Sequence, residues 1–314
     1  MGKVSREQIF TNYNWLRKNS KFLNIIIGDD LDAALSSTLY LHLHPTSRII
    51  GIYKKFTEIY FSRNFFTTFQ DLINSPDTIW LDLDIYSRNC KSLGHHVVRW
   101  SDKDILEGFN SSLNINELFR ISVKHFNNKY PLGTIHFLLW LYDIQIPKQR
   151  YADKLIWLAD SAFINAQRYK NNVKNWINNI FPMDSIIKTF TKIDRLNFEQ
   201  DMFRFYNYMI QKHIHLGKSQ VKSKNLNLPG YQCNIKKVPE DLLTLTTFIA
   251  DITGWSFKKK QIHLRNLIRV KGEKGNIKLC DLLSNYKKLE NFLIKKNVFS
   301  YAIIRQNILS YTSF

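Results

Sequence analysis

The stretch FLNIIIGDDLDAALSSTLYL, residues 22–41, predicts how the fold of this chain begins. Its first six residues are mostly apolar and β-branched and stop at Gly28, which is typical of a short strand buried in a sheet. Three acids follow within four positions, and residues 33–41 then have the composition of a helix. A strand, an acidic loop and a helix in this order indicate the first part of a βαβ unit.

The same pattern recurs over the next residues. Residues 48–53 and 78–84 are two further strand candidates, and residues 65–74 are expected to form a helix between them. Strands that alternate with helices predict an α/β fold with a mostly parallel sheet and flanking helices. Ligands of such sheets bind beyond the carboxyl ends of the strands. Because acids follow the first strand at 29–32 and the third at 82–84, we expect the two acidic groups to converge.

The later part of the chain is expected to be mainly helical. Helical patterns cover residues 114–126, 133–143, 151–180, 197–215, 239–253 and 280–297. The polar, basic stretch 216–238 contains a Pro-Gly pair and is the best loop candidate. We place a boundary near residue 190, which divides the chain into a first domain of residues 1–190 and a basic, mainly helical accessory region of residues 191–314.

Charge indicates the class of partner. The formal net charge is +19, and it is distributed unevenly. Residues 186–314 carry 23 Lys and Arg against 9 Asp and Glu, whereas residues 1–185 carry 22 against 17. A region this cationic attracts polyanions, so we expect a nucleic acid or a nucleotide as partner. A surface that serves solubility, or one that meets an anionic membrane, is the alternative interpretation.

Cysteine spacing and hydropathy indicate the compartment. The three cysteines lie far apart and form no Cys-x-x-Cys pair, which favours a reducing, cytoplasmic setting. Since no apolar run is long enough to span a bilayer, we expect no membrane partner. The sequence also lacks the phosphate-binding loop, dinucleotide, zinc-protease and serine-hydrolase motifs, which weakens the case for those four enzyme classes.

Polar residues in four places are candidates for one metal site: Asp30 and Asp32, Asp82 and Asp84, His95 and His96, and Asp160. Carboxylates and imidazoles are suitable ligands for Mn²⁺ or Mg²⁺. Two such ions about 3.5–4 Å apart can bind a phosphate, produce hydroxide from water and stabilise the leaving oxygen. One acidic pair is too few ligands for two ions, but the four places together supply enough.

The order of these residues resembles the DHH phosphoesterases, a family that includes RecJ-like exonucleases, oligoribonucleases and cyclic-dinucleotide phosphodiesterases. That family opens with a strand and the motif Asp-x-Asp-Gly/Ala-x-x-Ser, which is matched here by Asp30, Asp32, Ala33 and Ser36. An Asp at the end of a later strand corresponds to Asp82 or Asp84, and the name-giving Asp-His-His is partly matched by residues 94–96. Asp160 could supply the fourth motif. The resemblance covers about residues 22–162.

The resemblance implies a two-metal phosphodiesterase or nuclease. Its two Mn²⁺ or Mg²⁺ ions would be held by Asp30, Asp32, Asp82, Asp84, His95 and Asp160. His96 would contact the scissile phosphate while the ions activate a water, so that Asp30, Asp32 and His96 carry the catalysis. Further contacts to the substrate are expected from Ser36, Lys258, Lys259, Lys260, Arg265 and Arg269.

Two positions depart from the family pattern and keep a second hypothesis open. Ile26 stands where the family often has His, and Gly94 replaces the Asp of Asp-His-His. A nucleic-acid- or nucleotide-binding protein with a decayed catalytic site is therefore the alternative. Simpler structural roles also exist, because Asp residues before a helix cap its N-terminus. The aromatic residues expected mainly in the core are Tyr53, Tyr60, Phe61, Phe65, Phe66 and Phe69.

Overall fold

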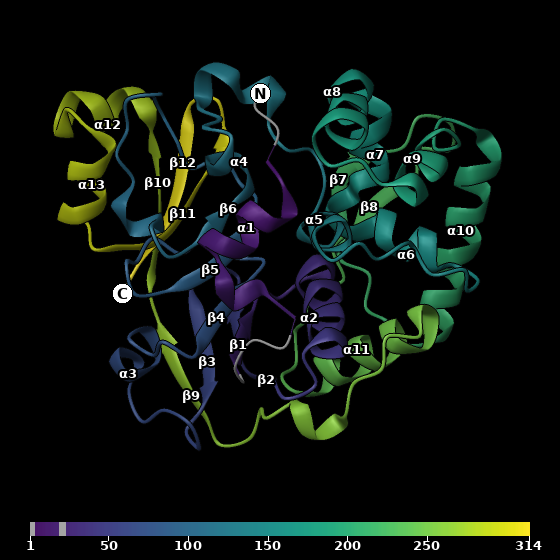
Figure 1. The fold of residues 1–314 in the computed structure, drawn as a ribbon, viewed down its shortest axis with the longest axis horizontal. Coiled ribbons are helices and arrows are strands. Elements are labelled where there is room, and N and C mark those ends of the chain that lie inside the picture. Colours follow the sequence, from purple (N-terminus) through teal and green to yellow (C-terminus); the bar gives the residue numbers. More distant parts are fainter. Residues whose placement is uncertain (1–3, 19–22) are drawn as a thin grey trace. The chain divides into compact units, whose positions relative to one another are not determined.

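The computed structural model describes residues 4–18 and 23–314 (Figure 1). The chain divides into two compact units, each made of separate segments. The sheet unit comprises Met1–Gly28, Thr46–Tyr130 and Ile262–Phe314, and the helical unit comprises Asp29–Pro45 and Pro131–Gln261. Because the units alternate along the sequence, neither unit coincides with residues 1–190 or with residues 191–314. The division into a first domain and a basic accessory region stays a prediction.

A seven-stranded sheet with the order β6-β5-β4-β1-β2-β3-β9 forms the centre of the sheet unit. Its strands are β1 Asn24–Ile27, β2 Arg48–Lys54, β3 Glu58–Ser62, β4 Thr78–Leu81, β5 Lys91–Gly94, β6 Leu113–Asn114 and β9 Leu267–Lys271. The four pairings from β6 to β2 are parallel, whereas β2–β3 and β3–β9 are antiparallel. The predicted α/β class with a mostly parallel sheet is confirmed. Phe22, the first residue of the expected strand, lies outside the described residues.

Apolar packing explains these strands. All four residues of β1 are buried, as expected for a central parallel strand. Ile26 is fully buried in one apolar cluster with Trp80 of β4 and Leu72 of helix α3 (Phe69–Ile73). An imidazole at position 26 would lose this packing and sit among apolar side chains. Gly51 of β2 permits the close approach, because a Cβ there would lie 2.5 Å from Ile26 Cδ1.

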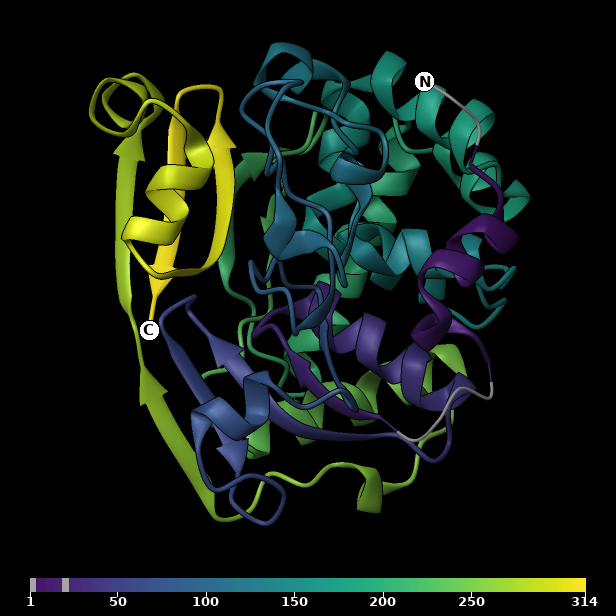
Figure 2. The same ribbon diagram turned by 60° about the vertical axis from the view of Figure 1, so that its left-hand side comes forward.

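A second, antiparallel sheet in the sheet unit has the order β10-β12-β11. Its strands are β10 Glu273–Lys278, β11 Val298–Arg305 and β12 Ile308–Ser313, with helices α12 Leu279–Tyr286 and α13 Leu289–Lys295 packed against it. Strand β9 continues into β10 through Gly272, where a Cβ would lie 2.6 Å from the Ser313 carbonyl oxygen (Figure 2). The expectation of a mainly helical region 191–314 is therefore wrong after residue 262, where strands prevail.

The helical unit contains α2 Leu31–Leu43, α5 Thr134–Leu141, α6 Ala152–Leu158, α7 Ala162–Arg168, α8 Lys170–Asn175, α9 Asp184–Phe190, α10 Leu196–Gln211 and α11 Glu240–Thr253. Helix α5 is buried on all sides, which agrees with its almost wholly apolar sequence. The expected helix 151–180 is broken into shorter helices, first at Asp160. The expected loop 216–238 carries a small hairpin of β7 Lys218–Lys222 and β8 Pro229–Tyr231.

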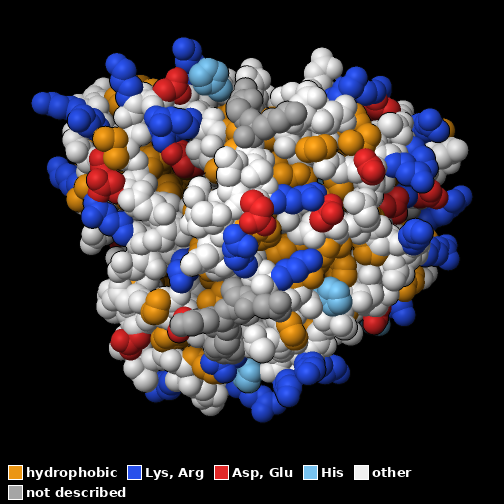
Figure 3. All heavy atoms as spheres, viewed as in Figure 1, with side chains coloured by type: hydrophobic (Ala, Val, Ile, Leu, Met, Phe, Trp, Pro, Cys, Tyr) orange, Lys and Arg blue, Asp and Glu red, His pale blue; other side chains and the backbone are white. Residues whose placement is uncertain are grey.

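The surface is mixed in character. Figure 3 shows Lys and Arg side chains spread over the visible face and interspersed with acidic and apolar side chains. Across residues 4–18 and 23–314, no helix is long and apolar enough to cross a bilayer.

Candidate functional site

Two carboxylate–imidazole pairs lie at the carboxyl ends of β4 and β5 in the sheet unit. Asp82 directly follows β4, and its Oδ1 lies 3.4 Å from Nδ1 of His95, which directly follows β5. The Oδ2 of Asp84 lies 2.8 Å from Nδ1 of His96. Because β4 and β5 are parallel neighbours, the acids after one strand meet the histidines after the other. The structure thus brings together four of the predicted site residues.

The backbone at Asp82 has an unusual conformation. Its φ of 60° lies in the left-handed region, which costs a residue with a Cβ about 1–2 kcal/mol. The next residue, Leu83, is fixed by a hydrogen bond of 3.0 Å from its N–H to the Leu93 carbonyl. The Asp82 side chain is only 6% exposed. A buried carboxylate on a strained backbone is a common feature of functional sites.

Asp84 holds His96 in one orientation. Its Oδ2 accepts hydrogen bonds from the His96 N–H at 3.3 Å and from Nδ1 at 2.8 Å, and its Oδ1 accepts one of 2.6 Å from the Asn114 amide. The Nδ1 proton faces the carboxylate, which leaves Nε2 of His96 available for another partner. The His96 side chain is 42% exposed. Asp84 is therefore well placed to orient the imidazole, with both oxygens already engaged.

Gly94 is required by the same carboxylate. A Cβ at this position would lie 2.0 Å from Asp84 Oδ1 and 2.8 Å from the Leu83 carbonyl oxygen. The carboxylate of Asp84 occupies the space that a side chain at position 94 would need. The glycine at position 94 thus has a physical cause.

His95 is more deeply buried than His96, with 9% of its side chain exposed. Its ring stacks on that of His96, with centroids 4.7 Å apart, and meets Tyr130 edge-on. The side-chain amide of Asn116 donates to the His95 carbonyl at 2.5 Å and accepts from the Tyr130 N–H at 2.8 Å. These contacts fix the histidine pair against the sheet.

Asp30 and Asp32 belong to the helical unit and both bind helix N-termini. Asp30 is the N-cap of α2 and accepts the Ala33 N–H at 3.1 Å, which is the simpler structural role that the sequence also allowed. Asp32 is fully buried and accepts the N–H groups of Thr134 at 2.6 Å and Ile135 at 2.9 Å, at the start of α5. The Ser36 hydroxyl lies 3.5 Å from Asp32 Oδ1. The positive end of α5 stabilises the ionised Asp32 carboxylate.

Asp160 lies in the helical unit at the break between α6 and α7. It and Ser161 both have left-handed backbones, with φ values of 50° and 56°. Two consecutive residues of this kind are uncommon outside glycine. The Asp160 carbonyl accepts a hydrogen bond of 3.2 Å from the Asn165 amide. Asp160 therefore lies on a strained stretch of backbone, as Asp82 does.

The predicted basic residues lie in different places. Lys258, Lys259 and Lys260 are exposed in the helical unit. Arg265 and Arg269 lie in the sheet unit on or before β9, four strands from β4, which is about 19 Å at the usual strand spacing. The Arg269 guanidinium pairs with Glu58, and Arg265 lies at the edge opposite the carboxyl ends. Arg265 and Arg269 could therefore contact only a ligand long enough to extend from β9 to the carboxyl end of β4.

Lys274 was not among the residues predicted to bind substrate, yet it lines a pocket together with Asp84 and His96. Only the basic composition of residues 258–278 hinted at it. The chain was also compared with known proteins, and it matches no family model and no curated protein sequence. The geometry of the site therefore carries the functional argument.

Proposed function

We propose that the protein is a metal-dependent phosphodiesterase or nuclease that hydrolyses a nucleic acid or a small nucleotide with Mn²⁺ or Mg²⁺ as cofactor. The observation that carries the proposal is the pairing of Asp82 with His95 beside a His96 oriented by Asp84. The DHH phosphoesterase resemblance of the sequence supports the same assignment.

The residues present suit such an ion. Asp82 and His95 offer a carboxylate oxygen and an imidazole nitrogen 3.4 Å apart. Neighbouring ligands of an octahedral ion with bonds of about 2.1 Å lie roughly 3 Å apart, so small shifts would let both donors share one cation. A carboxylate suits Mg²⁺ and Mn²⁺, whereas an imidazole suits borderline transition-metal ions, so the pair fits Mn²⁺ better than Mg²⁺ or a soft metal.

The remaining ligands would be Asp30, Asp32 and Asp160, as the DHH phosphoesterase resemblance implies.

Bound ions would activate a water and offset charge on the phosphate. Residues of the chain would position the phosphate and exchange the proton. His96, with Nδ1 held by Asp84, would direct Nε2 to the phosphate and exchange a proton there. Asn114, which donates to both Asp84 and the His96 carbonyl, would keep the pair aligned.

The test is hydrolysis of labelled single-stranded DNA, RNA and dinucleotides in Mn²⁺ or in chelator. His96→Ala should lower turnover at least about 100-fold, since general acid–base groups usually supply 10²–10⁴-fold. Asp82→Asn should abolish turnover, because it removes a charged ligand of the ion that activates the water. Asp281→Asn, on the exposed face of α12, is the matched control and should have no effect. Unchanged turnover in Asp82→Asn would overturn the assignment.

A nucleic-acid- or nucleotide-binding protein without catalysis is the second candidate. The engagement of both Asp84 oxygens and the apolar Ile26 favour it. In that case binding should persist in chelator, weaken steeply with salt and be unaffected by Asp82→Asn, and no product should form.

A further inference from the structure

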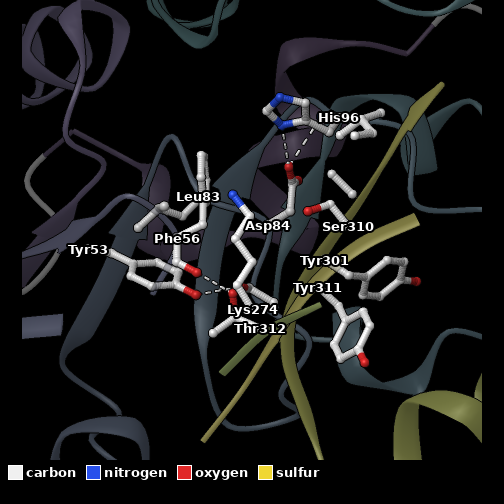
Figure 4. Close-up of a pocket in the computed structure, with 13 residues that line it drawn as sticks. Tyr53, Phe56, Leu83, Asp84, His96, Lys274, Tyr301, Ser310, Tyr311 and Thr312 are labelled. Carbon is white, nitrogen blue, oxygen red and sulfur yellow. Dashed lines mark hydrogen bonds and ion pairs between the residues drawn. The ribbon is translucent and has the colours of Figure 1, made fainter. Parts of the chain in front are cut away.

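A small pocket lies beside the Asp84–His96 pair, entirely within the sheet unit (Figure 4). It is formed by the turn between β2 and β3, the segment after β4 and the strands of the second sheet. Its volume is about 170 Å³. Pockets that hold drug-sized molecules usually measure about 300–1,000 Å³, so this one has room for a single ring system.

Two aromatic residues, Tyr53 and Phe56, contribute to the wall of the pocket. Figure 4 shows Tyr53 on one side, whereas the rings of Tyr301 and Tyr311 are directed away from the pocket. Tyr301 is buried in the apolar cluster that includes α12 and α13, and the Tyr311 ring meets Phe292 of α13 at 5.1 Å. The Tyr53 hydroxyl bonds to Ser300 Oγ at 2.8 Å, so the Tyr53 ring offers mainly apolar surface to the pocket.

Phe56 is held at the pocket in a costly conformation. It is 44% exposed, and it follows Lys55 in a turn where both residues have φ values near 54°. Hairpin turns with two left-handed residues normally use Asn or Gly, so a bulky aromatic here is unusual. The Thr312 hydroxyl donates to the Phe56 carbonyl and ties the turn to β12. An exposed ring fixed in this way is suited to stacking.

Lys274 brings a cation to the end of the pocket that Asp84 and His96 line. Figure 4 shows the Lys274 ammonium directed toward the end formed by Leu83 and Asp84, where His96 also lies. Lys274 contacts the Phe56 ring at 5.5 Å and has no ion-pair partner within the described part of the chain. An exposed ammonium without a carboxylate is a ready partner for an anionic group.

We propose that this pocket binds the base of a nucleotide, with the phosphate placed at the Lys274 and His96 end. A space for one ring system beside the exposed Phe56 ring and the Lys274 ammonium matches a base joined to a phosphate. The inference rests on the proposed function, since the phosphate bound here would be the one presented to Asp82, His95 and His96. The substrate class would be a chain whose terminal nucleotide is recognised through its base.

Binding without metal tests the pocket. A nucleoside 5′-monophosphate and ribose 5-phosphate should be titrated against the full chain in chelator by calorimetry. The monophosphate should bind roughly tenfold tighter, the difference expected from one stacked base. Lys274→Ala should weaken both ligands, and Lys274→Arg should restore much of the binding. Equal affinity for the two ligands would overturn the proposal.

Phe56 variants give the matched comparison. Phe56→Ala should remove most of the preference for the monophosphate, and Phe56→Trp should keep it. Phe203→Ala removes a similarly exposed ring, 52% exposed on α10, and should change nothing. Circular dichroism and the melting temperature check that Phe56→Ala stays folded. A monophosphate preference that survives Phe56→Ala in folded protein would also overturn the proposal.

The proposed hydrolysis and the proposed base-binding pocket can be overturned independently of each other. Asp82→Asn should abolish hydrolysis and leave monophosphate binding in chelator intact. If Asp82→Asn still hydrolyses substrate while base-dependent binding needs Phe56, the assigned chemistry is wrong and the pocket stands. If hydrolysis needs Asp82 but the base makes no difference to binding, the pocket assignment is wrong and the chemistry stands.

Discussion

The carboxylate of Asp84 fills the space in front of Gly94, where a Cβ would come within 2.0 Å of Oδ1. The two positions are therefore coupled, because a side chain at position 94 fits only if the Asp84 carboxylate moves. The same carboxylate orients His96. Packing and the candidate chemistry consequently depend on one pair of residues.

Gly94→Ala is expected to destabilise the fold by about 2–4 kcal/mol, because overpacking costs about 1–3 kcal/mol and displaced hydrogen bonds add to it. Urea unfolding measures the change. Gly94→Ala combined with Asp84→Ala should cost clearly less than the sum of the two single changes, since the clash disappears. Strict additivity would contradict the coupling.

Asp32→Ala should cost more stability than Asp30→Ala. Asp30 accepts one cap bond, worth about 1 kcal/mol, whereas Asp32 is buried and accepts two bonds from α5, for which about 3 kcal/mol is expected. Thermal or urea unfolding compares them. Equal losses would show that the α5 contact is weak. Asp32→Asn, which keeps the shape, is the better variant for activity assays.

Mn²⁺ should stabilise the protein through Asp82 and His95. A ligand at 100 times its Kd adds about 2.7 kcal/mol to the free energy of unfolding, which a thermal-shift assay detects easily. Asp82→Asn should remove most of the shift, and chelator should reverse it. Asp281→Asn should shift like the parent protein. A full shift in Asp82→Asn would place the ion elsewhere.

Glu199 should make stability fall in acid. Burial alone would raise its pKa, but hydrogen bonds from Ser223, Leu226 and Asn225 outweigh burial and hold the pKa below its ordinary value. A lowered pKa adds stability that is fully present above about pH 4.3 and is lost as the pH falls through the folded-state pKa. Glu199→Gln should lose about 2 kcal/mol at pH 7 and flatten the acid limb of the stability curve.

Cysteine modification should follow burial. Cys90 and Cys233 are buried and Cys280 is exposed. Burial raises the pKa of the Cys90 thiol to about 12 and that of Cys233 further still, which suppresses their reactive thiolate forms. Iodoacetamide should label Cys280 in the native protein and the other two only after unfolding. Peptide mass spectrometry measures this, with Cys280→Ser as control.

Local patterns predicted the start of the fold well. The described residues 23–41 form β1 and the start of α2 as expected, because a short apolar run and an acidic loop determine both elements locally. The approach of Asp82 and Asp84 to His95 and His96 follows from neighbouring parallel strands, although the partner of each acid was not foreseen.

Other features depend on contacts between distant residues. Asp32 binds Thr134, 102 residues away, and no local pattern marks that pairing. The break at Asp160 carries no glycine or proline that would reveal its left-handed backbone. Residues 298–313 form a hairpin that pairs with β10, and no strand was predicted for either segment. Tertiary contacts decided these cases over local preference.

The alternation of the two units along the chain affects how the protein assembles during synthesis. The helical unit is complete once residue 261 has left the ribosome, whereas the sheet unit still lacks β9 and the whole second sheet until residues 262–314 emerge. Until then the edge of β3 that pairs with β9 is uncovered, and uncovered edges invite aggregation. A fragment ending near residue 190 would keep this edge permanently exposed and should be recovered mainly in inclusion bodies.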